Sequence, residues 1–99
     1  MPPLDSRIVL ISGAGRGIGA ASARRLAAGG AKVVLADIDK AAVEKLAAEL
    51  GGVAVQADVT RAADITSMVD EAYRRFGRLD VLFNNAGVIR VQPLLEVTE

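Results

Sequence analysis

A glycine-rich string follows the first apolar run of the chain, and its spacing suits a diphosphate. The run 7–12 reads Arg-Ile-Val-Leu-Ile-Ser, and Gly-Ala-Gly-Arg-Gly-Ile-Gly follows at 13–19. A diphosphate needs backbone N–H groups at close range and the positive end of a helix dipole, and Cβ atoms would block its approach. Gly13, Gly17 and Gly19 form G-x-x-x-G-x-G rather than G-x-G-x-x-G, so a plain tight turn is the alternative. The position between an expected strand and an expected helix favours a phosphate site.

An acidic residue ends the second apolar run, 32–37, and stands 18 residues after Gly19. From this position Asp37 could accept hydrogen bonds from the ribose hydroxyls of an adenosine, and its charge would repel the 2′-phosphate of NADP. The alternative is that Asp37 only opens the turn before Asp39. Arg16 in the glycine-rich string favours NADP instead, because a guanidinium can pair with a phosphate. On balance, the residues favour NAD.

Two further polar segments follow the third and fourth apolar runs. After the run 53–56, Asp58 could reach an adenine amino group and Val59 could line the site. The alternative for Asp58 is an Asx-turn that leads into a helix capped by Thr60. Asn84-Asn85-Ala86-Gly87 follows the run 79–83, where its amides could tie strand ends together or present backbone to a cofactor. Read alone, that tetrapeptide could also be an ordinary turn.

Helical patterns separate the apolar runs, and glycines end them. The alanine-rich stretch 20–28 stops at a glycine pair. The next helix takes Asp39 as its N-cap and ends at a second glycine pair. The longest helix begins at Thr60 and ends at Gly77. Its apolar positions make an unbroken stripe that we expect to be buried, namely Ile65, Met68, Val69, Ala72, Tyr73 and Phe76.

The order of elements is βαβαβαβ, followed by a tail that ends at Glu99, and it indicates an α/β fold with a doubly wound parallel sheet. Right-handed crossovers place the first two helices on one face and the third on the other, with strand order 3-2-1-4. The fourth strand would then be an open edge, and one face would have a single helix. We therefore expect the isolated chain to self-associate, to need a partner or to be unstable.

Composition narrows the classes of function. Residues 1–99 form one domain at most, and 52% hydrophobic with 24% charged residues indicates a globular protein. Twelve basic and twelve acidic residues balance, so we expect no nucleic-acid or membrane partner. The absence of cysteine and histidine excludes disulfides, Cys/His metal sites and imidazole triads. The opening residues resemble no secretory signal, so a cytoplasmic location is expected.

Together these segments resemble the short-chain dehydrogenase/reductase family over about residues 6–95. The resemblance rests, in order and spacing, on Ser12-Gly13-x-x-x-Gly17-Ile18-Gly19, Asp37, Asp58-Val59 and Asn84-Asn85-Ala86-Gly87. It implies a Rossmann-type domain, truncated after the fourth strand, that binds NAD in preference to NADP. It also implies a homo-oligomeric enzyme that transfers hydride between this cofactor and a small alcohol or carbonyl compound.

The resemblance also implies roles for individual residues. The glycine-rich string would approach the pyrophosphate, Asp37 would bind the adenosine ribose, and the residues after the second and third strands would surround the adenine. The amide turn would line the cofactor cleft. The implied cofactor-binding residues are Gly13, Arg16, Gly17, Ile18, Gly19, Asp37, Ile38, Asp58, Val59, Asn85, Ala86 and Gly87.

The catalytic serine and Tyr-x-x-x-Lys pair of that family have no counterpart among these residues. The single tyrosine, Tyr73, has Gly77 rather than lysine at the fourth following place. No catalytic or metal-binding residue is therefore assigned, and these 99 residues alone are expected to be inactive. A stand-alone, inactive nucleotide-binding or interaction module is the alternative, and a flavodoxin-like fold with accidental similarity is a third hypothesis.

Overall fold

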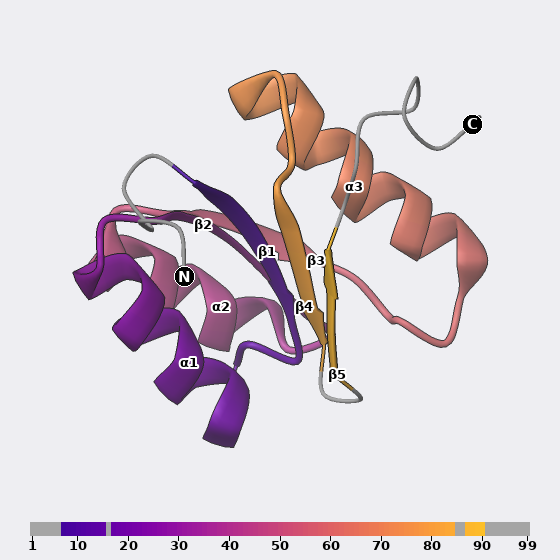
Figure 1. Ribbon diagram of the computed structural model, residues 1–99. Coiled ribbons are helices and arrows are strands. Elements are labelled where there is room, and N and C mark those ends of the chain that lie inside the picture. The colour runs from indigo at the N-terminus through magenta and orange to yellow at the C-terminus, as the bar shows by residue number, and fades with distance from the viewer. Residues whose placement is uncertain (1–6, 16, 85–86, 91–99) are drawn as a thin grey trace.

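The computed structural model describes residues 7–15, 17–84 and 87–90, which form one sheet flanked by helices (Figure 1). The strands are β1 (Ile8–Ser12), β2 (Lys32–Asp37), β3 (Val53–Gln56), β4 (Val81–Asn84) and β5 (Gly87–Arg90). The helices are α1 (Gly17–Ala28), α2 (Lys40–Leu50) and α3 (Ala62–Phe76). None of these helices is both long and apolar enough to cross a bilayer.

The described residues form a sheet with strand order β3-β2-β1-β4-β5. The first four strands are parallel, which confirms the expected order 3-2-1-4. The expectation that the fourth strand is an open edge is wrong, because β5 pairs with it antiparallel and places Val88 opposite Phe83. The apolar, β-branched Val88 and Ile89 suit a strand, and two residues between Asn84 and Gly87 suffice for a hairpin.

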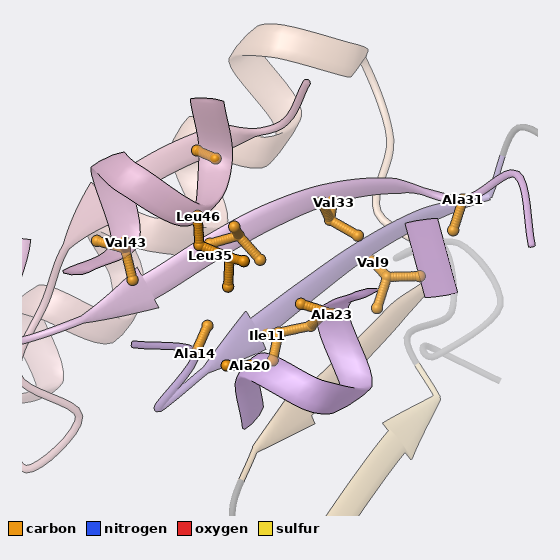
Figure 2. Close-up of a cluster of buried hydrophobic side chains, with 11 residues drawn as sticks. Val9, Ile11, Ala14, Ala20, Ala23, Ala31, Val33, Leu35, Val43 and Leu46 are labelled. Carbon is orange, nitrogen blue, oxygen red and sulfur yellow. The ribbon is translucent and has the colours of Figure 1, made fainter. Parts of the chain in front are cut away.

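Alternate residues of β1 and β2 face opposite sides of the sheet. Figure 2 shows the cluster on the side of α1 and α2. Its buried members are Val9, Ile11, Ala14, Ala20, Ala23, Ala31, Val33, Leu35, Val43, Leu46 and Ala47. The cluster on the side of α3 contains Ile8, Leu10, Val34, Ala36, Ala57, Met68, Ala72 and Leu79. The first two helices therefore cover one face and the third covers the other, as expected.

The caps of α2 follow the sequence prediction. The Asp39 carboxylate accepts a hydrogen bond from the backbone N–H of Ala42 at 3.1 Å, and this satisfies one donor of the first turn. At the other end Gly51 has a left-handed φ of 70° and donates its N–H to the carbonyl of Ala47. A residue with a Cβ would be strained at that φ, so glycine is the residue that ends the helix cleanly.

Two predictions about α3 are wrong. Thr60 does not cap the helix; Arg61 occupies the N-cap position without a side-chain bond, and the Thr60 hydroxyl binds Asp58 instead. The apolar stripe is also less buried than expected. Met68 and Ala72 are buried, but Ile65 in the first turn is 37% exposed and Tyr73 is 42% exposed. A single helix on a sheet face buries only its central positions, and no second described helix flanks α3 on that side.

Asp80 ties the start of β4 to the start of β1. The expected strand 79–83 begins two residues later, at Val81, and Asp80 just before it uses its carboxylate as a bridge. The Ile8 N–H donates to its Oδ2 at 2.8 Å, and Arg78 Nε donates to the same oxygen at 3.0 Å. Partial burial alone would raise the pKa of Asp80, but the bond from Ile8 and the charges of Arg78 and Arg7 outweigh it and lower that pKa.

This bridge predicts an acid-sensitive contribution to stability. Replacing Asp80 with alanine removes the acceptor of the Ile8 N–H. It should lower the free energy of unfolding at pH 7 by about 1.5–3 kcal/mol. Because the folded-state pKa is below the unfolded one, the stabilisation is present at neutral pH. It is lost as the pH falls through the folded-state pKa.

Urea denaturation of the wild type and Asp80→Ala between pH 7 and pH 3 measures the difference. The control is Asp70→Ala, at an exposed position of α3, which should match the wild type. A gap that stays constant with pH would show that packing, not the carboxylate charge, causes the loss.

Candidate cofactor-binding site

The carboxyl ends of the parallel strands place three loops at one edge of the sheet, in the lower part of Figure 1. Backbone bonds join these loops in series. The N–H of Ala14, after β1, donates to the carbonyl of Ala36 at 3.1 Å. The N–H of Ala57, after β3, donates to the carbonyl of Asp37 at 3.0 Å. Residues predicted to share a site are therefore adjacent in the fold, and in open α/β sheets this edge is where ligands bind.

The glycine-rich loop has the backbone geometry that its spacing predicted. Gly13 and Gly17 have φ angles of 67° and 61°, which side chains rarely adopt. Gly19 lies in the first turn of α1, where a Cβ would be 2.1 Å from the carbonyl oxygen of Gly13. The loop thus turns tightly against the start of α1, whose first N–H groups have no partner within the helix. Arg16 lies outside the described residues.

Asp37 stands at the centre of this edge and uses both carboxylate oxygens. Its Oδ2 accepts from the N–H of Gly15 at 2.9 Å, and its Oδ1 accepts from the N–H of Asp39 at 2.9 Å. The second bond is the turn that the sequence offered as an alternative, and the first joins Asp37 to the glycine-rich loop. Gly15 was not singled out from the sequence, although it belongs to the glycine-rich string. Its partner stands 22 residues away, so spacing alone could not reveal the pair.

The loop after β3 is organised by two carboxylates. Asp58 Oδ1 accepts from the Thr60 hydroxyl at 2.6 Å and from the Thr60 N–H at 2.9 Å, which is the Asx-turn considered from the sequence. These bonds, the hydroxyl first, lower the pKa of Asp58. The Asp58 N–H in turn donates to Asp64 Oδ2 at 2.8 Å. Sequence reasoning missed Asp64, and an acidic residue in the first turn of a helix was the only available signal.

Three large apolar side chains at this edge are exposed. Ile18 is 77% exposed, Ile38 61% and Val59 47%, and each belongs to the connection after a different strand. All three were predicted as cofactor contacts, while only two other large apolar residues in the described part of the chain are comparably exposed. Apolar side chains next to a few convergent polar groups are typical of a ligand site.

The structure describes the two ends of the amide turn after β4, Asn84 and Gly87. Asn85 and Ala86 lie outside the described residues. Gly87 begins β5 and pairs with Asn84, the last residue of β4. Asn84 ends the strand next to β1, so this pair lies at the same edge of the sheet as the carboxyl end of β1.

Comparison with known proteins confirms the resemblance noted in the sequence. A family model described as short chain dehydrogenase matches residues 7–99. The chain therefore belongs to the short chain dehydrogenase family, whose members among the relatives found here are dehydrogenases and reductases.

Relatives and solved structures agree with this assignment. Meso-2,3-butanediol dehydrogenase of Serratia marcescens is 46% identical over 97 residues, which are 95% of this chain and 39% of that protein. Galactitol 2-dehydrogenase of Agrobacterium fabrum is 43% identical over 98 residues, 97% of this chain and 38% of that protein. The chain thus spans about two fifths of the length of these curated relatives.

Two solved structures share the fold and carry a nicotinamide cofactor. The 3-ketoacyl-(acyl-carrier-protein) reductase from Brucella melitensis, complexed with NADH, has a TM-score of 0.78 and 46% identity, over 80% of this chain and 34% of that chain. A short chain dehydrogenase/reductase from Burkholderia phymatum in complex with NAD has a TM-score of 0.80 and 33% identity, over 83% of this chain and 31% of that chain.

The loop geometry predicts that replacing Gly17 and replacing Gly19 lower the stability of the protein by different amounts. Helix propensity alone would make alanine favourable by about 1 kcal/mol at either position. Gly19→Ala should instead destabilise the protein by about 3 kcal/mol or more, because its Cβ meets the backbone of Gly13. Gly17→Ala should cost only about 1–2 kcal/mol, since a Cβ there points into open space and only the positive φ is strained. Thermal denaturation of both variants tests this order, and equal losses would contradict the close approach at Gly19.

Proposed function

We propose that residues 1–99 are the NAD-binding domain of an oxidoreductase that acts on a small alcohol or carbonyl compound. The observation that carries the proposal is the position of the Asp37 carboxylate, which lies against the glycine-rich loop at the ligand-binding edge of the sheet. The membership in a family of dehydrogenases and reductases supports it, as do the cofactors bound by two similar structures. When bound, a nicotinamide dinucleotide supplies the group that accepts or donates hydride.

The residues of this edge fit such a cofactor. The backbone N–H groups of Gly13, Gly17 and the first turn of α1 would hold the pyrophosphate, and Ile18 would contribute its backbone on the nicotinamide side. Asp37 would accept from the adenosine ribose hydroxyls, since each of its oxygens has a lone pair beyond the one that its N–H partner uses. The other proposed contacts are Arg16, Gly19, Ile38, Asp58, Val59, Asn85, Ala86 and Gly87.

The exposed side chains near Asp37 suit an adenine ring. Ile38 and Val59 follow β2 and β3 and would cover the two sides of the base. Asp58 Oδ1 is engaged by Thr60, so the adenine amino group would donate to Oδ2. Asp58 is ionised at neutral pH, the bonds from Thr60 lower its pKa further, and an ionised carboxylate is the stronger acceptor.

Charge favours NAD over NADP in this proposal. A 2′-phosphate placed at about 4 Å from the Asp37 carboxylate would be repelled by about 1 kcal/mol in water and by about 4 kcal/mol at the effective dielectric near a protein surface. NAD instead offers two hydroxyl donors at that place. The difference is large enough for Asp37 to decide the choice of cofactor.

No residue among the 99 is proposed as the catalytic acid or base. Proton transfer to a carbonyl oxygen needs a group such as a tyrosine with a lowered pKa, and Tyr73 is an exposed residue of α3 without a lysine at the fourth following place. In the proposed function this chain holds the cofactor, and a longer protein that contains it would supply the serine, tyrosine and lysine. A homo-oligomeric assembly and a cytoplasmic location stay predictions.

Titration calorimetry with NAD and NADP tests this function. The Asp37→Ala variant should bind NAD about tenfold or more weakly, because bonds from the ribose to a charged acceptor are lost. NADP should be weakened less, since the same substitution removes its repulsion. The informative quantity is the ratio of the two affinities.

Asp39→Ala is the matched control, because Asp39 is a carboxylate of the same turn whose side chain caps α2 rather than binding the described part of the glycine-rich loop. Its affinity ratio should equal that of the wild type. Equal weakening of both cofactors in Asp37→Ala would count against the ribose contact. NAD binding without turnover in the protein isolated from its source would favour an inactive nucleotide-binding module.

A further inference from the structure

The Asp37 carboxylate binds the glycine-rich loop itself, which a role in ribose binding does not require. The bond from the Gly15 N–H to Oδ2 crosses from β2 to the loop after β1, between residues 22 positions apart. The bond from the Asp39 N–H to Oδ1 fixes the same carboxylate from its own turn. Asp37 is thus held on one side by the start of α2 and holds the loop on the other.

Steric contact shows how closely the loop lies on this carboxylate. A Cβ placed on Gly15 would be 2.9 Å from Asp37 Oδ2 and 3.1 Å from the Cβ of Ala42 on α2. Real Cβ atoms essentially never approach another atom so closely, so any side chain at Gly15 would push the carboxylate away. The lack of a side chain at Gly15 thus leaves room for the Asp37 carboxylate and for Ala42, and its φ is not positive.

Among the described residues, the last backbone–backbone hydrogen bond of the loop before α1 is the one made by Ala14. That residue is fully buried and donates its N–H to the carbonyl of Ala36, which extends the contact between the ends of β1 and β2 by one step. The next residue, Gly15, is tied by the side chain of Asp37 instead. A backbone carbonyl thus holds Ala14, and a carboxylate holds Gly15, two residues before α1 begins at Gly17.

We propose that Asp37 is a positioning residue for the glycine-rich loop, which it holds in its cofactor-receiving shape before any cofactor is present. The inference rests on the proposed function, because the loop shape matters only if a diphosphate binds there. A carboxylate offers about four lone-pair sites, and two N–H groups occupy two of them. The remaining sites can accept ribose hydroxyls, so the loop stays tied when the dinucleotide is bound.

Amide hydrogen exchange of the cofactor-free protein, followed by NMR, tests the tie directly. The Gly15 amide should exchange about tenfold or more faster in Asp37→Ala than in the wild type, because a bond to a charged acceptor is lost. The Ala14 amide, which binds a backbone carbonyl, should keep its protection. In Asp39→Ala, which removes a carboxylate two residues away, the Gly15 amide should exchange as in the wild type. An unchanged Gly15 rate in Asp37→Ala would overturn the proposal.

Amides of the central strands, such as those of Leu10 and Leu35, show whether each variant is folded. If Asp37→Ala does not fold, Asp37→Asn keeps the size of the side chain but replaces one acceptor oxygen with a donor nitrogen. It can then accept from only one of Gly15 and Asp39 through its remaining oxygen. Faster exchange of the Gly15 amide in Asp37→Asn supports the bond to the loop, because even a retained amide oxygen is a weaker acceptor than a carboxylate, and a wild-type Gly15 rate overturns it.

A ligand without ribose hydroxyls separates the tie from the ribose contact. The probe is 2′,3′-dideoxyadenosine 5′-diphosphate, measured by calorimetry. Removing a negative charge next to an anionic ligand should by itself strengthen binding. The tie predicts the opposite, a severalfold weaker affinity of Asp37→Ala, whereas Asp39→Ala should bind the probe as tightly as the wild type or more tightly. Stronger binding by Asp37→Ala would overturn the proposal.

The two proposals fail in different ways. Faster Gly15 exchange in Asp37→Ala with equal losses of affinity for NAD and NADP supports the bond between Asp37 and the loop and contradicts the ribose contact. A wild-type Gly15 rate with a selective loss of NAD affinity removes the tie and keeps the ribose contact. A loss of affinity that is common to NAD and NADP reports the effect of Asp37 on the loop. The ratio of the two affinities reports the contact between Asp37 and the ribose.

Discussion

Burial of β1 on both faces is the constraint on which the rest of the structure depends. All five of its residues are buried, and it pairs in parallel with both β2 and β4. A parallel neighbour can be reached only by a crossover, so the chain must return across the sheet through a helix each time. The alternating side chains of β1 need cover on both sides, which α1 and α2 give on one face and α3 gives on the other. The same parallel order collects the loops after β1, β2 and β3 at one edge, where the candidate site lies.

At that edge, short polar side chains replace regular backbone pairing. Asp37 connects the first loop to the second, and Asp58 with Asp64 orders the third. Each carboxylate satisfies backbone N–H groups that no strand or helix would otherwise bind, which is a requirement for loops lying so close to a buried core. The apolar residues between them are left exposed, and this combination distinguishes the edge from the opposite end of the sheet. There, Asp80 is surrounded by Arg7, Arg78 and the start of β1, an arrangement that stabilises strand pairing.

The differences between prediction and structure have a common origin in competition for partners. Thr60 was expected to cap α3, but Asp58 precedes it by two residues and takes both its N–H and its hydroxyl. Gly87 was read as the end of a turn and residues 88–90 as part of a tail, yet the open side of β4 offers these residues a row of backbone partners. Ile65 and Tyr73 continue an apolar stripe that the sheet face is too narrow to bury. In each case the local pattern does not specify which neighbour is available.

The sequence by itself determined the order of the first four strands and the three helices, the glycine positions that end the helices, and the family. Apolar periodicity, helix caps and helix-breaking residues are local signals that span only a few residues, so they can be recognised in the sequence alone. Only the tertiary structure decided which groups from distant segments meet, such as Gly15 with Asp37 and Ile8 with Asp80. The physical reason is that a hydrogen bond depends on the distance between two atoms in space. Residues far apart in sequence come within that distance only when the strands between them pack into a sheet.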